Sequence, residues 1–599
     1  MGVSLMASQF SGYTVVGIPA EAYKDGFSAW RWPGSTLFAA LVYLAYSPRL
    51  QWLARARGYD SMLSFIQDRY AIRDQRKDPY HWFMMIIVFI PCLIYLFAQF
   101  VAFSATIETL SNGDVTALQA SIGLAVLIAL YEILGGLRAV AATDVIQGTV
   151  LVLGSLCILF FIDTTFGGLP KLTKELEDIS PSHVNVMSSE VSLSWAEFWI
   201  GVGIQRALFP DYPQRAMAAA SQTSLRIGTA ILCFSPFLVQ VPLLFFGIVG
   251  RVKYSELSDA KEVFTLVVLD IIDGDQAGRI IGSLVMAASV AAIMSTADSV
   301  LIILSQLLTL DCIRPCRKGP EGTEGAESGS CTVIAGRIVT LILAAVCVPI
   351  VGGNVDLSAM IALQSAILMQ VFPTFVIALY WRGLHKWASF AGTFVGVVCG
   401  VALHIAKVNG GILIAFGCNL VITLLVAVAL SHKAAPVDEK HAEFLELISW
   451  RPPREAAKAF LHKPCVREPM SHNWWMMVVA LILPWFAIPF YRKAESFDVY
   501  LSGSPAWAVT SVMVLLAEAC LLVYMIVYNW AGPEDEVTSA ADADVDTKHV
   551  VYAGDGPSSQ EISALRDEIK DLKDKVEDLS SLKIQVRDTI REEVAALFH

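Results

Sequence analysis

Apolar residues in this chain come in blocks of about twenty, and polar or charged segments separate the blocks. A hydrocarbon core about 30 Å thick is crossed by roughly 20 helical residues that rise about 1.5 Å each. One such block could be the core helix of a soluble protein, but a long series of them predicts repeated crossing of a membrane. The pattern therefore predicts an all-α, multi-pass integral membrane protein. We expect about fourteen spans, at residues 4–22, 34–53, 82–107, 116–136, 140–162, 193–210, 225–249, 277–308, 333–352, 357–381, 387–406, 411–431, 474–491 and 505–529.

The composition supports a membrane location and argues against several other classes of protein. Of the 599 residues, 55% are hydrophobic and 16% are charged, whereas a soluble domain has roughly 25% charged residues. The net charge of −12 comes partly from an acidic stretch at 533–546, and no basic face favours nucleic acid. The eleven cysteines are scattered, mostly inside apolar blocks, which indicates small buried hydrophobes rather than disulfides. No nucleophile–base pair or metal-binding motif indicates an enzyme.

The positions of Lys and Arg in the loops predict the orientation of the chain, because cytoplasmic loops carry an excess of them. The loops 108–115 and 353–356 carry none, whereas the loops of the other parity are basic. Longer loops at 163–192 and 250–276 mix bases with acids and weigh less. We expect both termini in the cytoplasm and the chain in the plasma membrane. The basic loop residues are Arg49, Arg55, Arg57, Arg69, Arg73, Arg76, Lys77, Arg138, Arg215, Arg314, Arg317, Lys318, Arg382 and Lys386.

The chain after residue 431 divides into four parts. We expect a cytoplasmic loop at 432–473, two further spans within 474–529, an acidic linker at 530–557 and a cytoplasmic coiled coil at 558–599. The last part has β-branched residues at heptad position a and leucine at d, which is typical of a parallel two-stranded coiled coil. A homodimer through residues 559–597 follows, with a single amphipathic helix on the membrane or on the protein as the alternative. The a positions are Ile562, Ile569 and Val576, and the d positions are Leu565, Leu572 and Leu579.

The first span is a poor lipid-facing helix because polar residues, glycine and proline interrupt it. Gln9 and Ser11 lie at membrane depth, and Gly12 and Pro19 weaken the helical hydrogen bonding. Broken helices of this kind mark ion and substrate sites in transporters. A tightly packed interior helix is the alternative, which Gln9 and Pro19 together make less favourable.

A polar stripe lies on the span 277–308. Its members are spaced i, i+3, i+4 and i+7 and therefore share one helix face, with Asp298 at its edge. Adjacent hydroxyls and a carboxylate are hard oxygen ligands, which suit Na⁺ better than a soft metal. Hydroxyls that only bond back to their own helix are the alternative. The stripe consists of Ala292, Ser295, Thr296 and Ser299.

Asp144 lies near the start of the span 140–162. It can pair with Arg138 as a structural clamp or line an ion path, and the residues themselves favour neither. Two carboxylates at membrane depth, Asp144 and Asp298, repel each other unless a cation or a proton lies between them. H⁺ is therefore an alternative to Na⁺ as the coupled ion.

Four segments together resemble the sodium:solute symporter family. Their order and spacing match over about residues 1–431. Members usually carry another helix before the broken one, which here begins almost at Met1, so this member lacks that helix or the sequence is truncated. The segments are residues 7–12 (ASQFSG), 135–140 (GGLRAV) with Thr143 and Asp144, 213–219 (PQRAMAA) and 294–299 (MSTADS).

The resemblance implies a LeuT-like core of two inverted five-helix repeats, at about 4–162 and 193–381, with further C-terminal helices. Their first helices, 4–22 and 193–210, would be broken, and the repeats would rock around a midplane site. The implied sodium ligands are the carbonyls of Ala7, Phe10 and Ala292 and the hydroxyls of Ser295 and Thr296. The implied second cation site is Asp144, Asp298 and Ser299, where Asp298 replaces a hydroxyl of the family.

The resemblance also implies a function: Na⁺-coupled secondary active symport that imports a small polar organic solute. Arg206 would suit an anionic solute, or it only pairs with Asp211. A transporter-derived sensor or scaffold that signals through the coiled coil is the alternative, although nothing after residue 530 resembles the kinase module of such sensors. The candidate pocket residues are Gln9, Ser11, Gln99, Gln205 and Arg206.

Overall fold

The computed structural model describes most of the chain, with gaps in loops and at both ends. The predicted coiled coil at 558–599, nearly all of the acidic linker, and Ala7 fall outside the described residues. The described residues are 5–6, 9–313, 327–352, 356–431, 437–449, 468–469, 474–496, 500–501 and 503–530, without the side chains at 131–144, 158–165, 327–333, 350, 352, 449 and 500.

Helices occupy the positions of the predicted spans, because a helix satisfies its backbone hydrogen bonds within one apolar block. They are η1 (Tyr13–Gly17) with α2 (Ile18–Asp25), α3 (Arg31–Arg57), α5 (Pro79–Leu110), α6 (Ala117–Phe166), α8 (Ser189–Leu208), α10 (Gln222–Lys253), α12 (Gln276–Gln306), α14 (Glu327–Cys347), α15 (Leu357–Leu368), α17 (Lys386–Ile405), α18 (Gly411–Ala429), α20 (Trp474–Ile482) and α21 (Ala506–Tyr524) with η12 (Met525–Asn529).

Short helices and one small hairpin connect these elements. The two strands pair antiparallel, with Tyr500 opposite Pro505. The connecting elements are η2 (Gly26–Trp30), α4 (Met62–Arg69), α7 (Leu169–Ile179), η3 (Pro181–His183), α9 (Asp211–Ala218), η4 (Ala260–Glu262), α11 (Val263–Ile272), η5 (Leu307–Ile313), η6 (Val348–Gly352), η7 (Met369–Val371), α16 (Phe372–Phe375), η8 (Ile377–Leu379), α19 (Glu439–Ser449), η11 (Leu483–Ala487), β1 (Tyr500–Leu501) and β2 (Ser504–Pro505).

Fewer helices than the sequence predicts are long and apolar enough to cross a membrane. Among the described residues, seven helices are long and apolar enough to cross a membrane by length and composition. The count of fourteen is therefore not confirmed. The seven are Pro79–Leu110, Gln222–Lys253, Gln276–Ile313, Leu357–Leu379, Lys386–Ile405, Gly411–Ala429 and Ala506–Asn529.

Two predicted boundaries are wrong. The spans 116–136 and 140–162 form one helix, α6, of 50 residues. Glycine weakens a helix by only about 1 kcal/mol relative to alanine, and residues 117–166 contain no proline, so nothing local ends the helix. The span 474–491 is instead the nine-residue α20 followed by the 3₁₀ turn η11, because Pro484 cannot continue the α-helical hydrogen bonding.

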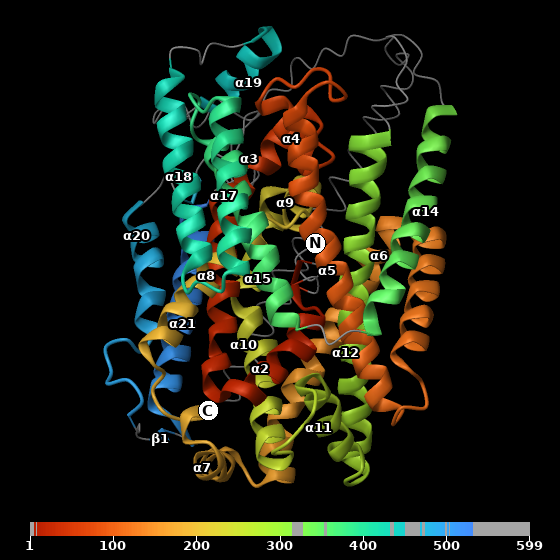
Figure 1. Cartoon of the computed structure of the whole chain (residues 1–599), viewed down its shortest axis with the longest axis vertical. Helices are drawn as coiled ribbons and strands as arrows, with labels where there is room; N and C mark the ends of the chain where they lie inside the picture. The colour runs from red at the N-terminus through yellow and green to blue at the C-terminus, as the bar shows by residue number, and fades with distance from the viewer. Residues whose placement is uncertain are drawn as a thin grey trace, which may run out of the picture. The chain divides into compact units, whose positions relative to one another are not determined.

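The helices α3 and α8 pack closely against each other in the interior of the molecule. A Cβ atom at Gly34 of α3 would lie 2.2 Å from the Trp199 ring of α8, and one at Gly203 of α8 would lie 2.9 Å from Phe38 of α3. Each helix thus offers a glycine to an aromatic ring of the other, as small residues do between membrane helices. In Figure 1 the pair α17 and α18 lies on the left and α6 and α14 lie on the right, with α10 and α2 between them.

Candidate cation and solute site

The first helical region breaks at Phe10 and Ser11, as the sequence predicts. Gln99 of α5 supports the break, because its Oε1 accepts a hydrogen bond of 2.7 Å from the backbone N–H of Gly12. The break takes away the helical partner of this buried N–H group. Without Gln99 the group would have no hydrogen bond and would destabilise the fold. A Cβ atom at Gly12 would lie 2.5 Å from Ala102 Cβ, so glycine lets α5 approach the break.

The break lies directly against the polar stripe of α12. The Thr296 hydroxyl donates to the carbonyl of Phe10 at 3.0 Å and to that of Ala292 at 3.1 Å. Ser295 and Thr296 are both buried. Three of the predicted sodium-ligand oxygens therefore meet at one point, and hard oxygens at such spacing fit Na⁺. Of the predicted ligands, only Ala7 falls outside the described residues.

The guanidinium of Arg215 lies next to the predicted second cation site. Asp298 is buried, and Ser299 Oγ accepts a long hydrogen bond of 3.5 Å from Arg215. Arg215 also lies 3.5 Å from the Asp211 carboxylate. A positive side chain next to Ser299 opposes a second cation there. The side chain of Asp144 is not among those described, so its part in this site stays a prediction.

A small cavity lies beside the break. Four of the five predicted pocket residues line it: Gln9, Ser11, Gln205 and Arg206. Gln99 does not line it, because its amide is used at Gly12. The other lining residues are Tyr13, Thr14, Trp32, Ser35, Thr36, Tyr95, Val202, Gln240, Ile361 and Gln364.

The sequence analysis missed several polar residues of this cavity. Gln240 donates to Thr36 Oγ1 at 2.9 Å, and Gln9 donates to the same atom at 3.1 Å. Gln364 of α15 donates to the Tyr13 hydroxyl at 2.9 Å. Gln240 and Gln364, like Gln99, are amides inside apolar spans. Which of the three faces the cavity depends on helix packing.

The second broken helix places an ion pair at the cavity. The helix α8 ends at Leu208, Phe209 is extended with φ −61° and ψ 130°, and α9 begins at Asp211. This turn allows Arg206 to donate to both carboxylate oxygens of Asp211, at 2.7 and 2.8 Å. Of the two roles considered for Arg206, the structure shows the pairing with Asp211.

Further contacts hold the guanidinium of Arg206 in place. Its Nε donates to Gln9 Oε1 at 3.2 Å, and its Cζ lies 4.4 Å from the centre of the Tyr212 ring. The Tyr212 hydroxyl also donates to Gln9 Oε1. Asp211 therefore offsets the charge of Arg206 at the cavity wall.

Comparison with known proteins agrees with this geometry. Residues 1–396 match the model of the sodium:solute symporter family. The chain is 24% identical over 410 residues to a sodium/pantothenate symporter of Haemophilus influenzae, covering 66% of this chain and 80% of that protein. It is 26% identical over 410 residues to the high-affinity proline transporter PutP of Bacillus subtilis, covering 66% and 81%.

A solved structure shares the fold. The chain resembles the substrate-bound, outward-open state of a Na⁺-coupled sialic acid symporter with a TM-score of 0.57 and 17% identity, over 73% of this chain and 90% of that one. This match confirms the predicted LeuT-like, all-helical fold. By sequence the chain belongs to the sodium:solute symporter family, whose members are transporters and not enzymes.

Proposed function

We propose that this Na⁺-coupled symporter imports a small, polar, organic solute by alternating access, with the cavity beside the broken helix as its solute site. The observation that carries the proposal is the arrangement of three consecutive residues. Gln9 and Ser11 line the cavity, and the carbonyl of Phe10 between them contacts Thr296. A cation bound at Phe10 would fix the backbone that builds the cavity wall, which couples the two sites.

The proposed sodium ligands are the carbonyls of Ala7, Phe10 and Ala292 and the hydroxyls of Ser295 and Thr296. Bound Na⁺ would supply a positive charge on which these oxygens converge. The Thr296 hydroxyl now directs its hydrogen toward the carbonyls of Phe10 and Ala292. On binding Na⁺ the hydroxyl would rotate to offer a lone pair to the ion. Its hydrogen bond to the Phe10 carbonyl would then be replaced by a cation that both oxygens bind.

The solute that fits this cavity is uncharged or zwitterionic and forms several hydrogen bonds. Four glutamines line the wall, Gln9, Gln205, Gln240 and Gln364. An amide NH2 group has two N–H donors, and the bonds of Gln9 and Gln240 to Thr36 and of Gln364 to Tyr13 use one donor each. The Arg206 charge is neutralised by Asp211, which favours a solute without net negative charge. The rings of Trp32 and Tyr95 provide apolar surface for its carbon skeleton.

Uptake into proteoliposomes tests the proposal. Purified protein would be offered a panel of labelled neutral, zwitterionic and anionic solutes, with an inward Na⁺ gradient or with K⁺ in its place. We expect accumulation of a neutral or zwitterionic solute only with the Na⁺ gradient. Na⁺-dependent uptake confined to anions would contradict the solute class, and concentrative uptake of equal extent in K⁺ would contradict the coupling.

A further inference from the structure

A glutamate lies deep inside the C-terminal apolar helix α21. Glu518 is fully buried, with 0% of its surface exposed. Neither of its carboxylate oxygens has a hydrogen-bond partner among the described residues. The surrounding segment Ala506–Asn529 is apolar and long enough to cross a membrane. Glu518 therefore does not belong to the cation and solute site, and it has no structural role as a hydrogen-bond acceptor.

Among the described residues, the surroundings of Glu518 offer no positive charge to neutralise an anion. The carboxyl interacts electrostatically with the buried Cys233 thiol of α10. On α10, Arg226 instead bonds the carbonyl of Val527, more than two turns from Glu518, and Arg251 and Lys253 lie in the last turn of the helix. On α3, Arg55 is exposed, and the other basic residues pair with carboxylates elsewhere: Arg31 with Glu21, Arg49 with Glu468 and Arg57 with Asp68.

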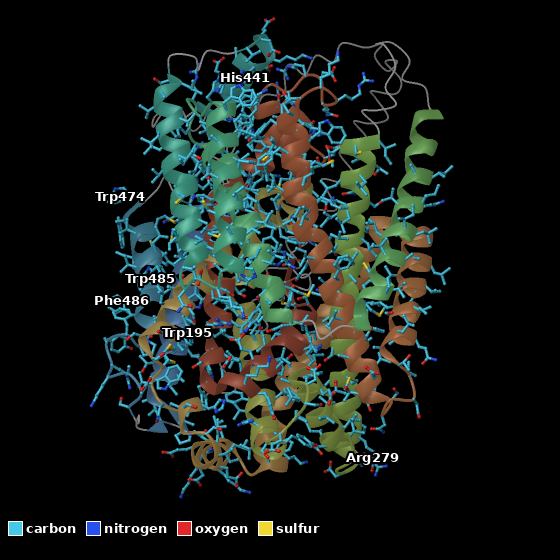
Figure 2. All side chains as sticks on the ribbon, viewed as in Figure 1. Trp195, Arg279, His441, Trp474, Trp485 and Phe486 are labelled. Atoms are coloured by element: carbon cyan, nitrogen blue, oxygen red, sulfur yellow. The ribbon has the colours of Figure 1, made fainter. Side chains whose placement is uncertain are left out.

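The other side of α21 is closed by apolar residues. The turn η11 packs along α21 and contains no charged residue. Its Phe486 is 53% exposed and lies on the outer flank of the helices in Figure 2. Glu518 is thus buried next to α10 in an apolar helix, where an ion without a partner is strongly disfavoured.

We propose that Glu518 is a proton-binding site, and that the proton allows α21 to stay packed against α10. In this conformation the carboxyl is a neutral acid, because the part of the chain that the structure describes brings no donor, cation or water-accessible surface to the anion. Loss of the proton would require α21 to separate from α10 or water to enter between them. The helix α10 also contributes Gln240 to the solute cavity. The protonation of Glu518 would therefore affect the packing of a helix that lines the transport site.

Thermal unfolding of the full-length protein in detergent, measured across pH, tests the proposal without reference to transport. In the unfolded chain a glutamate ionises above about pH 4.3, whereas Glu518→Gln is neutral in both states. Wild type alone must then take up a proton on folding, and its folding weakens as pH rises. We expect Glu518→Gln to be more stable than wild type, with the ratio of unfolding constants growing about tenfold per pH unit between about pH 6 and pH 8.

Glu197→Gln is the matched control. The carboxylate of Glu197 accepts hydrogen bonds from the backbone N–H groups of Gly410 and Ile412 at 3.2 and 2.7 Å. Because this carboxylate has hydrogen-bond donors in the folded protein, the stability difference between Glu197→Gln and wild type should not change over the same pH range. A Glu518→Gln difference that is equally independent of pH, or a variant less stable than wild type throughout, would overturn the proposal.

Discussion

The Thr296 hydroxyl connects two helices that are distant in sequence, and this single contact makes the sodium assignment testable. Replacing Ser295 and Thr296 with alanine removes two of the five proposed ligand oxygens. Hydrogen bonds and similar contacts to a charged group contribute about 1.5–3 kcal/mol each, so we expect the apparent Na⁺ affinity to fall on the order of 100-fold or more. The measurement is the initial rate of uptake as a function of Na⁺ concentration.

Ser289→Ala is the control for this experiment. Ser289 is also buried on α12, and its hydroxyl only bonds back to the carbonyl of Val285 at 2.8 Å. Its removal should leave the Na⁺ dependence as in wild type. An unchanged Na⁺ dependence in a membrane-inserted Ser295→Ala/Thr296→Ala protein would refute the assignment.

The buried pair of Arg206 and Asp211 makes a prediction about stability. Removing one partner of a buried ion pair costs about 3–5 kcal/mol, since an uncompensated charge remains. We therefore expect Arg206→Gln to lower the free energy of unfolding by about that amount, and Arg206→Gln/Asp211→Asn to recover part of it. Thermal unfolding of the purified variants measures this. If the double variant loses as much free energy of unfolding as Arg206→Gln and Asp211→Asn lose together, the two residues do not act as a pair.

At the scale of single elements, the loop helix α19 is docked by charges and by one buried ring. Arg73 donates to both oxygens of Asp438 at 2.6 and 2.7 Å, and Arg57 donates to Glu443 at 3.0 Å. Phe444 of α19 is fully buried and lies against Phe65 of α4. His441 is buried on the same helix, and Figure 2 shows it at the opposite end of the molecule from Arg279.

This arrangement predicts that docking of α19 weakens in acid. Burial lowers the pKa of His441, and the nearby charge of Arg69 lowers it further. When α19 is undocked, the pKa returns to about 6.5. Docking is then fully stable above about pH 6.5 and weakens as pH falls from there through the lowered pKa, because only the undocked helix takes up the proton. The hydrogen bonds from Arg73 lower the pKa of Asp438, so that pair persists over this range.

Hydrogen exchange of residues 437–449 measures the docking of α19. After correction for the intrinsic pH dependence, we expect faster exchange at about pH 5.5 than at about pH 7.5 in wild type. A His441→Gln protein should lose this difference. Equal protection at both pH values in wild type would mean that His441 does not govern docking.

At the scale of the whole molecule, the C-terminal tail is expected to associate without being needed for transport. Leucines on a coiled-coil seam contribute roughly 1.5–3 kcal/mol each when fully buried, and Leu565, Leu572 and Leu579 share one seam. A peptide of residues 555–599 should therefore be helical and dimeric in analytical ultracentrifugation, and uptake should survive its deletion. A monomeric peptide at high micromolar concentration would contradict the first expectation, and loss of uptake in a well-inserted deletion would contradict the second.

The sequence by itself predicted where most of the helices lie and that the first of them is broken. Both depend on local physics: an apolar block of sufficient length forms a helix in lipid, and Gly12 with Pro19 weakens one. The adjacency of Ser295 and Thr296 on one helix face was likewise readable, because helical spacing is a property of the chain alone. The family resemblance added that these hydroxyls share a site with the carbonyl of Phe10, and the structure brings the Thr296 hydroxyl to that carbonyl.

Only the tertiary structure decided how the buried polar residues are used. Gln99, Gln240 and Gln364 are all amides in apolar spans, yet Gln99 supports the broken helix while the other two line the cavity. Arg206 was open to two roles until the turn at Phe209 brought Asp211 within 2.7 Å of it. The direction in which a side chain points, and the group that it meets, depend on how helices rotate and pack against one another. That information is distributed over contacts between distant segments, so no local pattern contains it.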